Sequence, residues 1–303
     1  MPIAVQKLSS FRGHNDCVYT LAHGDQSNLF FSAAGDGMIV LWDLTKPDEG
    51  QLIATLPKSI YALHRHEDSN LLIAGHNYSG IHIINWQEKR EVASLKLTEA
   101  AIFDITSIDN LLLVGTGDGS LVSVNLKTAK LVDQIRVSEK SVRSIVVNRV
   151  LNEVAVGYSD NFIRVFDLYN LTLKYAFEAH TNSVFTLRYT KDGLYLMSGS
   201  RDARLKIWDA RGGYKLVNEV VAHLFAINDL AISPDGKYFV TASMDKSIKV
   251  WDAESQQLLK VIDKSRHAGH GTSVNKLLWS SHENQVISAS DDRTISIWSI
   301  IFE

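Results

Sequence analysis

A short phrase that ends in an aromatic residue recurs along this chain about every 43 residues. It reads GDGMIVLWD at 35–43, MDKSIKVWD at 244–252 and DDRTISIWS at 291–299, with weaker copies between them. The aligned positions are spaced by 43, 39, 42, 42, 43 and 47 residues and are Trp42, Asn85, Val124, Phe166, Trp208, Trp251 and Trp298. A repeat of this length predicts copies of one supersecondary unit. We therefore expect residues 1–303 to form a single array of seven units.

The residues around each aromatic position follow the pattern of β-strands. Leu-Lys-Ile-Trp at 205–208 and Ile-Lys-Val-Trp at 248–251 alternate with a period of two. Turn residues separate the apolar runs, as in TKDGLY at 190–195 and SPDGKY at 233–238. Four short strands fit into each copy, so we predict an all-β fold.

A second spacing distinguishes four of the copies. A histidine precedes an aspartate by 22 residues, a hydroxyl residue lies four before that aspartate, and a tryptophan follows it by six. The four sets are His14, Ser32, Asp36 and Trp42; His180, Ser198, Asp202 and Trp208; His223, Thr241, Asp245 and Trp251; and His270, Ser288, Asp292 and Trp298. With these sets and the Trp-Asp endings, the whole chain resembles the WD-repeat family. The resemblance implies a seven-bladed β-propeller of four-stranded antiparallel blades around a central channel.

Histidine, serine and aspartate are also the residues of a nucleophilic triad. Four copies of one catalytic site in one domain do not fit that interpretation, and the family resemblance implies a structural hydrogen-bonded chain instead. We therefore expect no catalytic residue in these sets. Repeats two to four depart from the pattern: Val114 and Val156 occupy hydroxyl positions, and Lys96 and Ser138 occupy histidine positions. We expect apolar packing to hold these blades, which would form the more mobile side of the ring.

The last repeat is one strand short, because the chain stops five residues after Trp298. Residues 5–11 precede the first Gly-His pair as residues 215–221 precede His223. We therefore expect residues about 5–11 to form the outer strand of the seventh blade and to close the ring. An unpaired strand edge would invite aggregation.

In the family, function usually lies at one mouth of the channel, near the start of each inner strand. The position five residues after the histidine falls there and holds Tyr19, Tyr61, Phe103, Arg143, Phe185, Asn228 and Asn275. Tyrosine and arginine are enriched in interface hot spots, so we expect a partner-binding mouth, with Tyr78 and Arg201 beside the turns of the same face. Two alternatives stay open: the aromatic side chains only plug the channel, or an aromatic pair holds a cation.

Composition narrows the classes of partner. The net charge of −3 does not favour nucleic acid or an anionic membrane as the main partner. Cys17 is the sole cysteine, which excludes an internal disulfide framework and suits a reducing compartment. The opening MPIAVQKLSSFRG lacks the apolar core of a secretory signal, and no apolar run reaches the length of a membrane span. We expect a cytoplasmic, monomeric propeller that belongs to a larger complex, binds a protein or peptide and needs no cofactor.

Other histidine, arginine and cysteine positions are candidates for metal, contact or nucleophilic sites. His64 and His66 are two apart and His267 and His270 three apart, but neither pair makes a full metal-ligand set, so we predict no metal. The connection at 264–271 is expected to be an extended loop on the binding face, with Arg266 and His267 as contacts. Cys17 is expected to be a small buried residue without an activating base.

Two other functions stay open at this stage. The first is a propeller enzyme or a small-ligand-binding propeller, which would need clustered carboxylates, a metal or a nucleophile at the mouth. The second is nucleic-acid binding through an arc of arginines, namely Arg143, Arg201 and Arg266.

Overall fold

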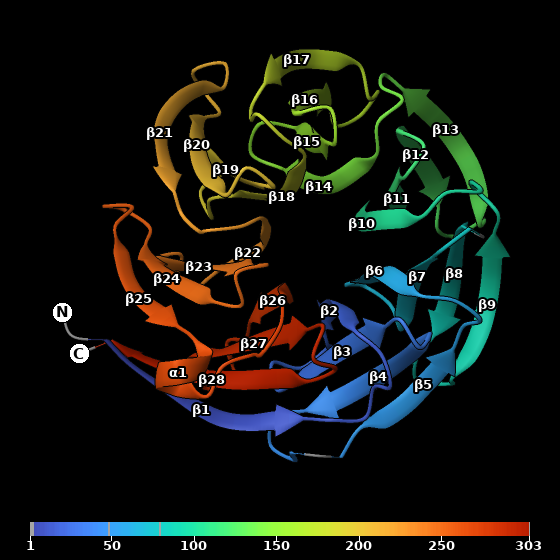
Figure 1. Cartoon of the computed structure of the whole chain (residues 1–303). Helices are drawn as coiled ribbons and strands as arrows, with labels where there is room; N and C mark the ends of the chain where they lie inside the picture. Colours follow the sequence, from blue (N-terminus) through green and yellow to red (C-terminus); the bar gives the residue numbers. More distant parts are fainter. Residues whose placement is uncertain (1–2, 48, 79, 303) are drawn as a thin grey trace.

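Seven four-stranded antiparallel sheets surround a central channel like the blades of a propeller (Figure 1). The computed structural model describes residues 3–47, 49–78 and 80–302. The predicted seven-bladed all-β fold is confirmed.

The first four blades follow one another along the chain. Blade 1 comprises β2 (Val18–His23), β3 (Leu29–Ala34), β4 (Met38–Asp43) and β5 (Gln51–Thr55). Blade 2 comprises β6 (Ile60–Arg65), β7 (Leu71–His76), β8 (Gly80–Asn85) and β9 (Arg90–Leu95). Blade 3 comprises β10 (Ile102–Ile108), β11 (Leu111–Thr116), β12 (Ser120–Asn125) and β13 (Lys130–Arg136). Blade 4 comprises β14 (Val142–Asn148), β15 (Glu153–Tyr158), β16 (Phe162–Asp167) and β17 (Leu173–Glu178).

The remaining blades complete the ring. Blade 5 comprises β18 (Val184–Tyr189), β19 (Tyr195–Ser200), β20 (Arg204–Asp209) and β21 (Lys215–Val221). Blade 6 comprises β22 (Ile227–Ile232), β23 (Tyr238–Ser243), β24 (Ile248–Asp252) and β25 (Leu258–Ile262). Blade 7 comprises β26 (Val274–Trp279), β27 (Gln285–Ser290), β28 (Ile295–Phe302) and the N-terminal β1 (Ile3–Phe11). The first strand of each blade lines the channel, and each such strand contacts the inner strands of both neighbouring blades.

Apolar side chains between adjacent blades form the core. The second strands supply fully buried residues, and small residues stand where a neighbouring blade approaches most closely. At Gly199 a Cβ atom would lie 2.7 Å from the Cγ2 atom of Ile227 on the next inner strand. Gly157 has the same relation to Val184, at 2.8 Å. A methyl group at either position would force the blades apart, because the interior is close-packed.

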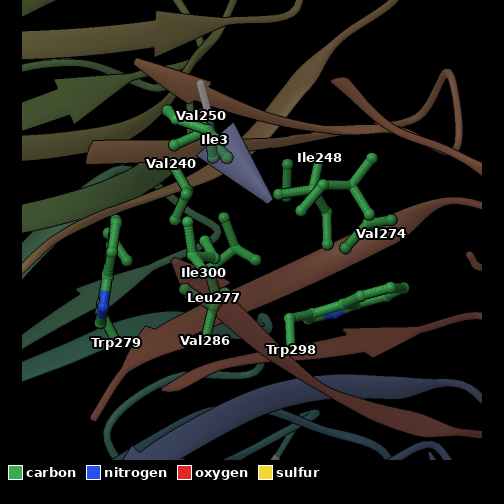
Figure 2. Close-up of a cluster of buried hydrophobic side chains, with 13 residues drawn as sticks. Ile3, Val240, Ile248, Val250, Val274, Leu277, Trp279, Val286, Trp298 and Ile300 are labelled. Carbon is green, nitrogen blue, oxygen red and sulfur yellow. The ribbon is translucent and has the colours of Figure 1, made fainter. Parts of the chain in front are cut away.

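The N-terminal strand closes the ring, as predicted. β1 pairs antiparallel with β28 from Ile3 opposite Phe302 to Phe11 opposite Ile295, with a bulge between Lys7 and Ser9. Figure 2 shows Ile3, at one end of β1, close to Val240 and Val250 of blade 6. The other end carries Phe11, which is 1% exposed and lies against the rings of Phe30 and Trp42 in blade 1. One strand therefore fills both seams beside blade 7.

Two details of the sequence alignment need correction. In repeat two, Ile84 pairs with Leu72 as Trp42 pairs with Phe30, so Ile84 and not Asn85 takes the tryptophan position. The connection at 264–271 contains one helical turn, α1 (Lys264–His267), rather than an extended loop, because the Asp263 carboxylate accepts the Arg266 backbone N–H and caps it. Besides α1, a 3-10 turn, η1 (His282–Asn284), precedes β27. No helix in the described part of the chain is long and apolar enough to cross a membrane.

Candidate partner-binding site

The four predicted His–hydroxyl–Asp–Trp sets each form one hydrogen-bonded chain. In blade 5 the Trp208 indole N–H donates to Ser198 Oγ at 2.9 Å, that hydroxyl donates to His180 Nε2 at 2.8 Å, and His180 Nδ1 donates to Asp202 at 3.0 Å. The sets of blades 1, 6 and 7 repeat this arrangement, with links of 2.7–3.3 Å. Each chain ties the turn between the second and third strands to the connector that enters the blade.

Burial and hydrogen bonding set the charge states in these chains. Burial lowers the pKa of His180, although Asp202 opposes it, so the neutral imidazole is favoured. Burial alone would raise the pKa of Asp202, but the His180 ring and two backbone N–H groups outweigh it and hold that pKa well below its usual range. The carboxylate is therefore committed to turn and connector contacts and is not free for chemistry.

Acidification is expected to destabilise the protein from about pH 6.5 downward. Burial lowers the pKa of His14, His180 and His223, and lowers that of His64 to about 4. Below pH 6.5 these histidines bind protons in the unfolded chain but stay neutral in the folded protein. Their contribution to the free energy of unfolding is therefore present above pH 6.5 and is lost as the pH falls. His64 alone accounts for about 3 kcal/mol between pH 7 and pH 4. Melting temperatures measured from pH 7.5 to 4.5 test this, and a flat profile would contradict it; His64→Leu should reduce the slope.

In blades 3 and 4, side chains other than histidine contact the aspartate of the turn between the second and third strands. In blade 3, Thr98 and Thr116 donate to the Asp118 carboxylate at 2.6 and 2.7 Å. The prediction that Lys96 takes the histidine position is wrong. Thr98 takes it, and Lys96 pairs with Glu99 at the surface. The cause is a shorter hairpin, since only residues 109–110 separate β10 from β11, which shifts the register by two. These blades thus have polar ties as well as the apolar packing that the sequence indicated.

In blade 4 the Arg164 guanidinium takes the place of the histidine. It contacts both oxygens of Asp160, at 3.0 and 2.8 Å. Its Cζ also lies 4.6 Å from the centroid of the Tyr158 ring. A bidentate arginine–carboxylate pair is a strong hydrogen-bonding unit.

A β-bulge near the start of every inner strand positions the predicted mouth residues. In blade 1 the pairing of β2 with β3 skips Tyr19, and the same irregularity occurs at the equivalent residue of each other blade. A bulge re-aims a side chain relative to regular pairing. The structure brings all seven predicted residues together around one cavity of about 350 Å³, namely Tyr19, Tyr61, Phe103, Arg143, Phe185, Asn228 and Asn275.

Four aromatic rings and one guanidinium form a continuous cluster along blades 1 to 5. The rings of Tyr19 and Tyr61 have centroids 4.7 Å apart, and those of Tyr61 and Phe103 are 5.9 Å apart. The Arg143 Cζ lies 3.8 Å from the centroid of Phe103 and 4.7 Å from that of Phe185. The chain's own arginine thus makes, with Phe103 and Phe185, the kind of contact that an external cation would make with an aromatic pair.

The positive charge of the Arg143 guanidinium has few polar partners within the protein. Its Nε is buried without a hydrogen-bond partner, and no described carboxylate lies within 4.0 Å of it. Burial lowers the pKa of Arg143 to about 10, although the Tyr61 hydroxyl favours the charge. The group therefore stays cationic at neutral pH in a partly dehydrated place, which makes it an anion acceptor.

The opposite side of the mouth, in blades 6 and 7, is made of amides that join neighbouring blades. Asn228 Nδ2 donates to the Val274 carbonyl at 2.8 Å. Asn275 Nδ2 donates to the Val18 carbonyl at 3.0 Å and to Asp291 at 2.7 Å. These side chains hold the ring together as well as lining the cavity, so the aromatic and arginine side is freer to meet a partner.

A charged floor below the mouth was missed by the sequence reasoning. Asp229 is 1% exposed; it accepts from Arg188 at 3.2 Å and from the Leu277 backbone N–H at 3.0 Å, and Lys276 Nζ is 3.4 Å away. Asp104 and Lys276 line both the mouth cavity and a second cavity of about 390 Å³ toward the other face. Asp104, Asp229 and Lys276 each directly follow a mouth residue, so reading one further column of the repeat would have found these three.

The remaining candidates lie away from the mouth cavity. Tyr78 is 60% exposed in the turn before β8, and Arg201 is exposed in the turn before β20; neither is among the residues that line the cavity. Arg266 of α1 pairs with Asp263, the residue that caps this helical turn. Cys17 is half-buried, and burial together with Asp291 raises the pKa of its thiol, so it is not activated.

Three of the four histidines in the two candidate metal pairs have other hydrogen-bond partners. His270 belongs to the hydrogen-bonded chain of blade 7. His64 Nε2 contacts Ser107 Oγ at 2.8 Å. His66 contacts Ser69 Oγ at 2.8 Å and the Asp109 carbonyl at 2.7 Å. Across the described ranges, no group of three or more His, Cys, Asp or Glu side chains is arranged to hold a metal ion.

The sequence of this chain is similar to parts of several larger proteins. The striatin homolog of Dictyostelium discoideum is 24% identical over 242 residues, which cover 68% of this chain and 29% of that protein. Mouse striatin is 26% identical over 249 residues, covering 72% of this chain and 31% of striatin. The mouse periodic tryptophan protein 2 homolog is 23% identical over 232 residues, covering 68% and 24%. The matched region thus spans less than a third of each relative.

A family model matches four segments of the chain. The model of the WD domain, G-beta repeat, matches residues 5–43, 171–209, 214–252 and 262–299, about half of the sequence. Each segment ends in one of the four blades that contain the full His–hydroxyl–Asp–Trp chain. Together with the seven-bladed architecture, these matches show that the chain belongs to the WD40 repeat family.

Proposed function

We propose that this chain is a non-enzymatic scaffold that binds a protein or peptide at the channel mouth, and that the partner places a carboxylate against Arg143. The observation that carries the proposal is the partly buried guanidinium between Phe103 and Phe185, whose Nε has no hydrogen-bond partner and which has no described carboxylate partner. An acidic side chain or a chain terminus would supply the missing charge and hydrogen bonds.

The open volume at the mouth supports binding rather than simple plugging. A channel filled by its own aromatic side chains would not leave about 350 Å³ beside them. The lining combines aromatic rings with an arginine, the residue types that dominate interface energetics. The chemistry of the partner is inferred from the residues of the mouth itself.

The proposed role does not include catalysis. The recurrent turn aspartates accept hydrogen bonds from their own blades, and Asp229 is held by Arg188, Lys276 and backbone N–H groups. Asp104 accepts the Ile145 backbone N–H at 2.7 Å. The carboxylates near the mouth are thus engaged in holding the channel, and we propose that the propeller works as one unit inside a larger complex.

Removing the aromatic side of the mouth should abolish partner binding without unfolding the protein. We expect Tyr61→Ala/Phe103→Ala to lose the proteins that co-purify from the native host, identified by mass spectrometry. Affinity for an identified partner should fall by about 2 kcal/mol or more, roughly thirtyfold. The melting temperature should fall only slightly, since both rings border an open cavity.

Two further variants sharpen this test. Arg143→Met keeps an adaptable apolar side chain between the phenylalanines but removes the charge, so it should lose the partner as well. Tyr169→Ala removes a tyrosine that is 79% exposed and lines no part of the mouth, so it should keep the partner. Retention of the same proteins by the double variant and by Arg143→Met would refute a mouth site.

A further inference from the structure

Three large apolar side chains stand exposed together on blade 6, and we name them the blade 6 ridge. Leu224 is 84% exposed, Phe225 60% and Met244 57%. Leu224 and Phe225 lie in the connector from β21 to β22, and Met244 lies in the turn between β23 and β24. That turn is bonded to the connector, because the Met244 N–H donates to the Ala226 carbonyl at 3.0 Å and Ser243 Oγ donates to the Phe225 carbonyl at 3.2 Å.

The fold does not require apolar side chains at these positions. The Leu224 backbone N–H donates to Asp245 at 3.1 Å, as the Thr181 N–H donates to Asp202 at 3.0 Å in blade 5. Blades 1 and 7 make the same bond. Blades 1, 5 and 7 place other residues on the same backbone: Asn15, Asp16 and Gly35; Thr181, Asn182 and Arg201; and Gly271, Thr272 and Asp291. The fold therefore does not depend on the type of side chain at these three positions, yet in blade 6 all three are apolar and exposed.

The charges beside the ridge are positive. The connector is bonded on its other side to the turn of blade 5, because the Ala222 N–H donates to the Ala203 carbonyl at 3.0 Å. Arg201 in that turn and Lys246 in the blade 6 turn are both exposed. The intervening carboxylates, Asp202 and Asp245, have side chains only 6% and 7% exposed. An apolar surface with cations on both sides complements a segment that carries apolar and acidic side chains.

The ridge adjoins the mouth. The connector runs from Phe225 directly into β22, whose Asn228 lines the mouth cavity. One extended segment on this face would meet cations at both ends of its path, Arg143 in the mouth and Arg201 at the ridge.

We propose that the blade 6 ridge is a docking site for an acidic, apolar segment of the same partner that engages the mouth. Its apolar side chains cover Leu224, Phe225 and Met244, and its carboxylates face Arg201 and Lys246. This proposal rests on the proposed function, and it adds a second contact that the mouth alone does not supply.

Selection from a displayed random-peptide library tests the ridge. The full chain is compared with a ridge variant, Leu224→Thr/Phe225→Asn, which gives blade 6 the residues of blade 5 and should therefore fold. The mouth variant is Arg143→Met. The control is Leu216→Thr/Val217→Asn, which removes two side chains that are 47% and 51% exposed on the outer strand β21.

The expected results separate the two contacts. The unaltered chain and the control should enrich sequences that pair Asp or Glu with Leu, Ile, Phe or Met. The ridge variant should keep the acidic preference, lose the apolar one, and bind a synthetic, fluorescein-labelled copy of the enriched sequence at least tenfold more weakly.

Three outcomes would overturn the ridge site. Apolar enrichment that survives in the ridge variant removes the ridge while leaving the mouth proposal intact. Enrichment of Lys or Arg by the unaltered chain contradicts the charge argument. A dimer in sedimentation that the ridge variant converts to monomer makes the ridge a contact between copies of this chain. Failure of the mouth proposal is recognised separately, by identical selection on the unaltered chain and on Arg143→Met.

Discussion

A chain that lacks residues 2–11 is expected to lose its cooperative thermal transition, or to melt more than 10 °C below the full chain and to aggregate. The deletion removes β1, the outer strand of blade 7, and leaves β28 paired only with β27, so that its outer edge is open. It also removes Ile3 and Phe11 from the two seams beside that blade. Burial of a phenylalanine alone is worth about 3–5 kcal/mol in large-to-small substitutions.

Circular dichroism melting and light scattering measure both parts of this expectation. Phe11→Ala keeps the strand but removes its packing against blade 1, so its fall in melting temperature should measure the contribution of that packing. Gln6→Ala changes an exposed residue of the same strand and should melt like the full chain. A truncated protein with an unchanged melting temperature and no aggregation would mean that β1 does not close the ring.

The second large effect is expected from Asp202→Ala, which should cost about 3–5 kcal/mol of the free energy of unfolding. The carboxylate accepts from His180 Nδ1 at 3.0 Å, from the Thr181 N–H at 3.0 Å and from the Arg204 N–H at 2.9 Å. Truncation leaves these donors without their acceptor in a largely buried place, at about 1–3 kcal/mol each when no water replaces it.

The adjacent residue is the matched control. Arg201→Ala alters an exposed side chain in the same turn and should change stability by less than about 0.5 kcal/mol. A double-mutant cycle of Asp202→Ala with His180→Ala, followed by denaturant unfolding, should show a coupling above about 1 kcal/mol. Equal stabilities of the Asp202 and Arg201 variants would show that the hydrogen-bonded chain does not hold the blade.

The repeat made most of the architecture predictable from sequence. Strands of period two and the spacing from His180 to Asp202 depend on local chain geometry that each copy repeats, so neighbouring copies check one another. The seven mouth residues were placed for the same reason: they recur with the spacing of the repeat, and each lies at a β-bulge.

Other features depend on packing between blades and could not be reached in that way. The contact of Arg143 with Phe103 and Phe185 joins three blades, and no spacing within one repeat predicts which neighbours a long side chain will meet. The shorter hairpin of blade 3 shifted its register by two residues, which is why Thr98 rather than Lys96 contacts Asp118. Tyr78 and Arg201 lie in turns and do not line the mouth cavity, which the spacing of the repeat does not reveal either.

The hydrogen bonds that fix each connector also bear on the entropy of association. In blade 6 the backbone that carries Leu224 and Phe225 is held by Asp245 on one side and by the turn of blade 5 on the other. Ordering a loop on binding costs free energy that a surface already held in place does not lose. A partner that docks here therefore meets a backbone fixed before it arrives, and substitutions among the exposed side chains can change specificity while the scaffold beneath them stays the same.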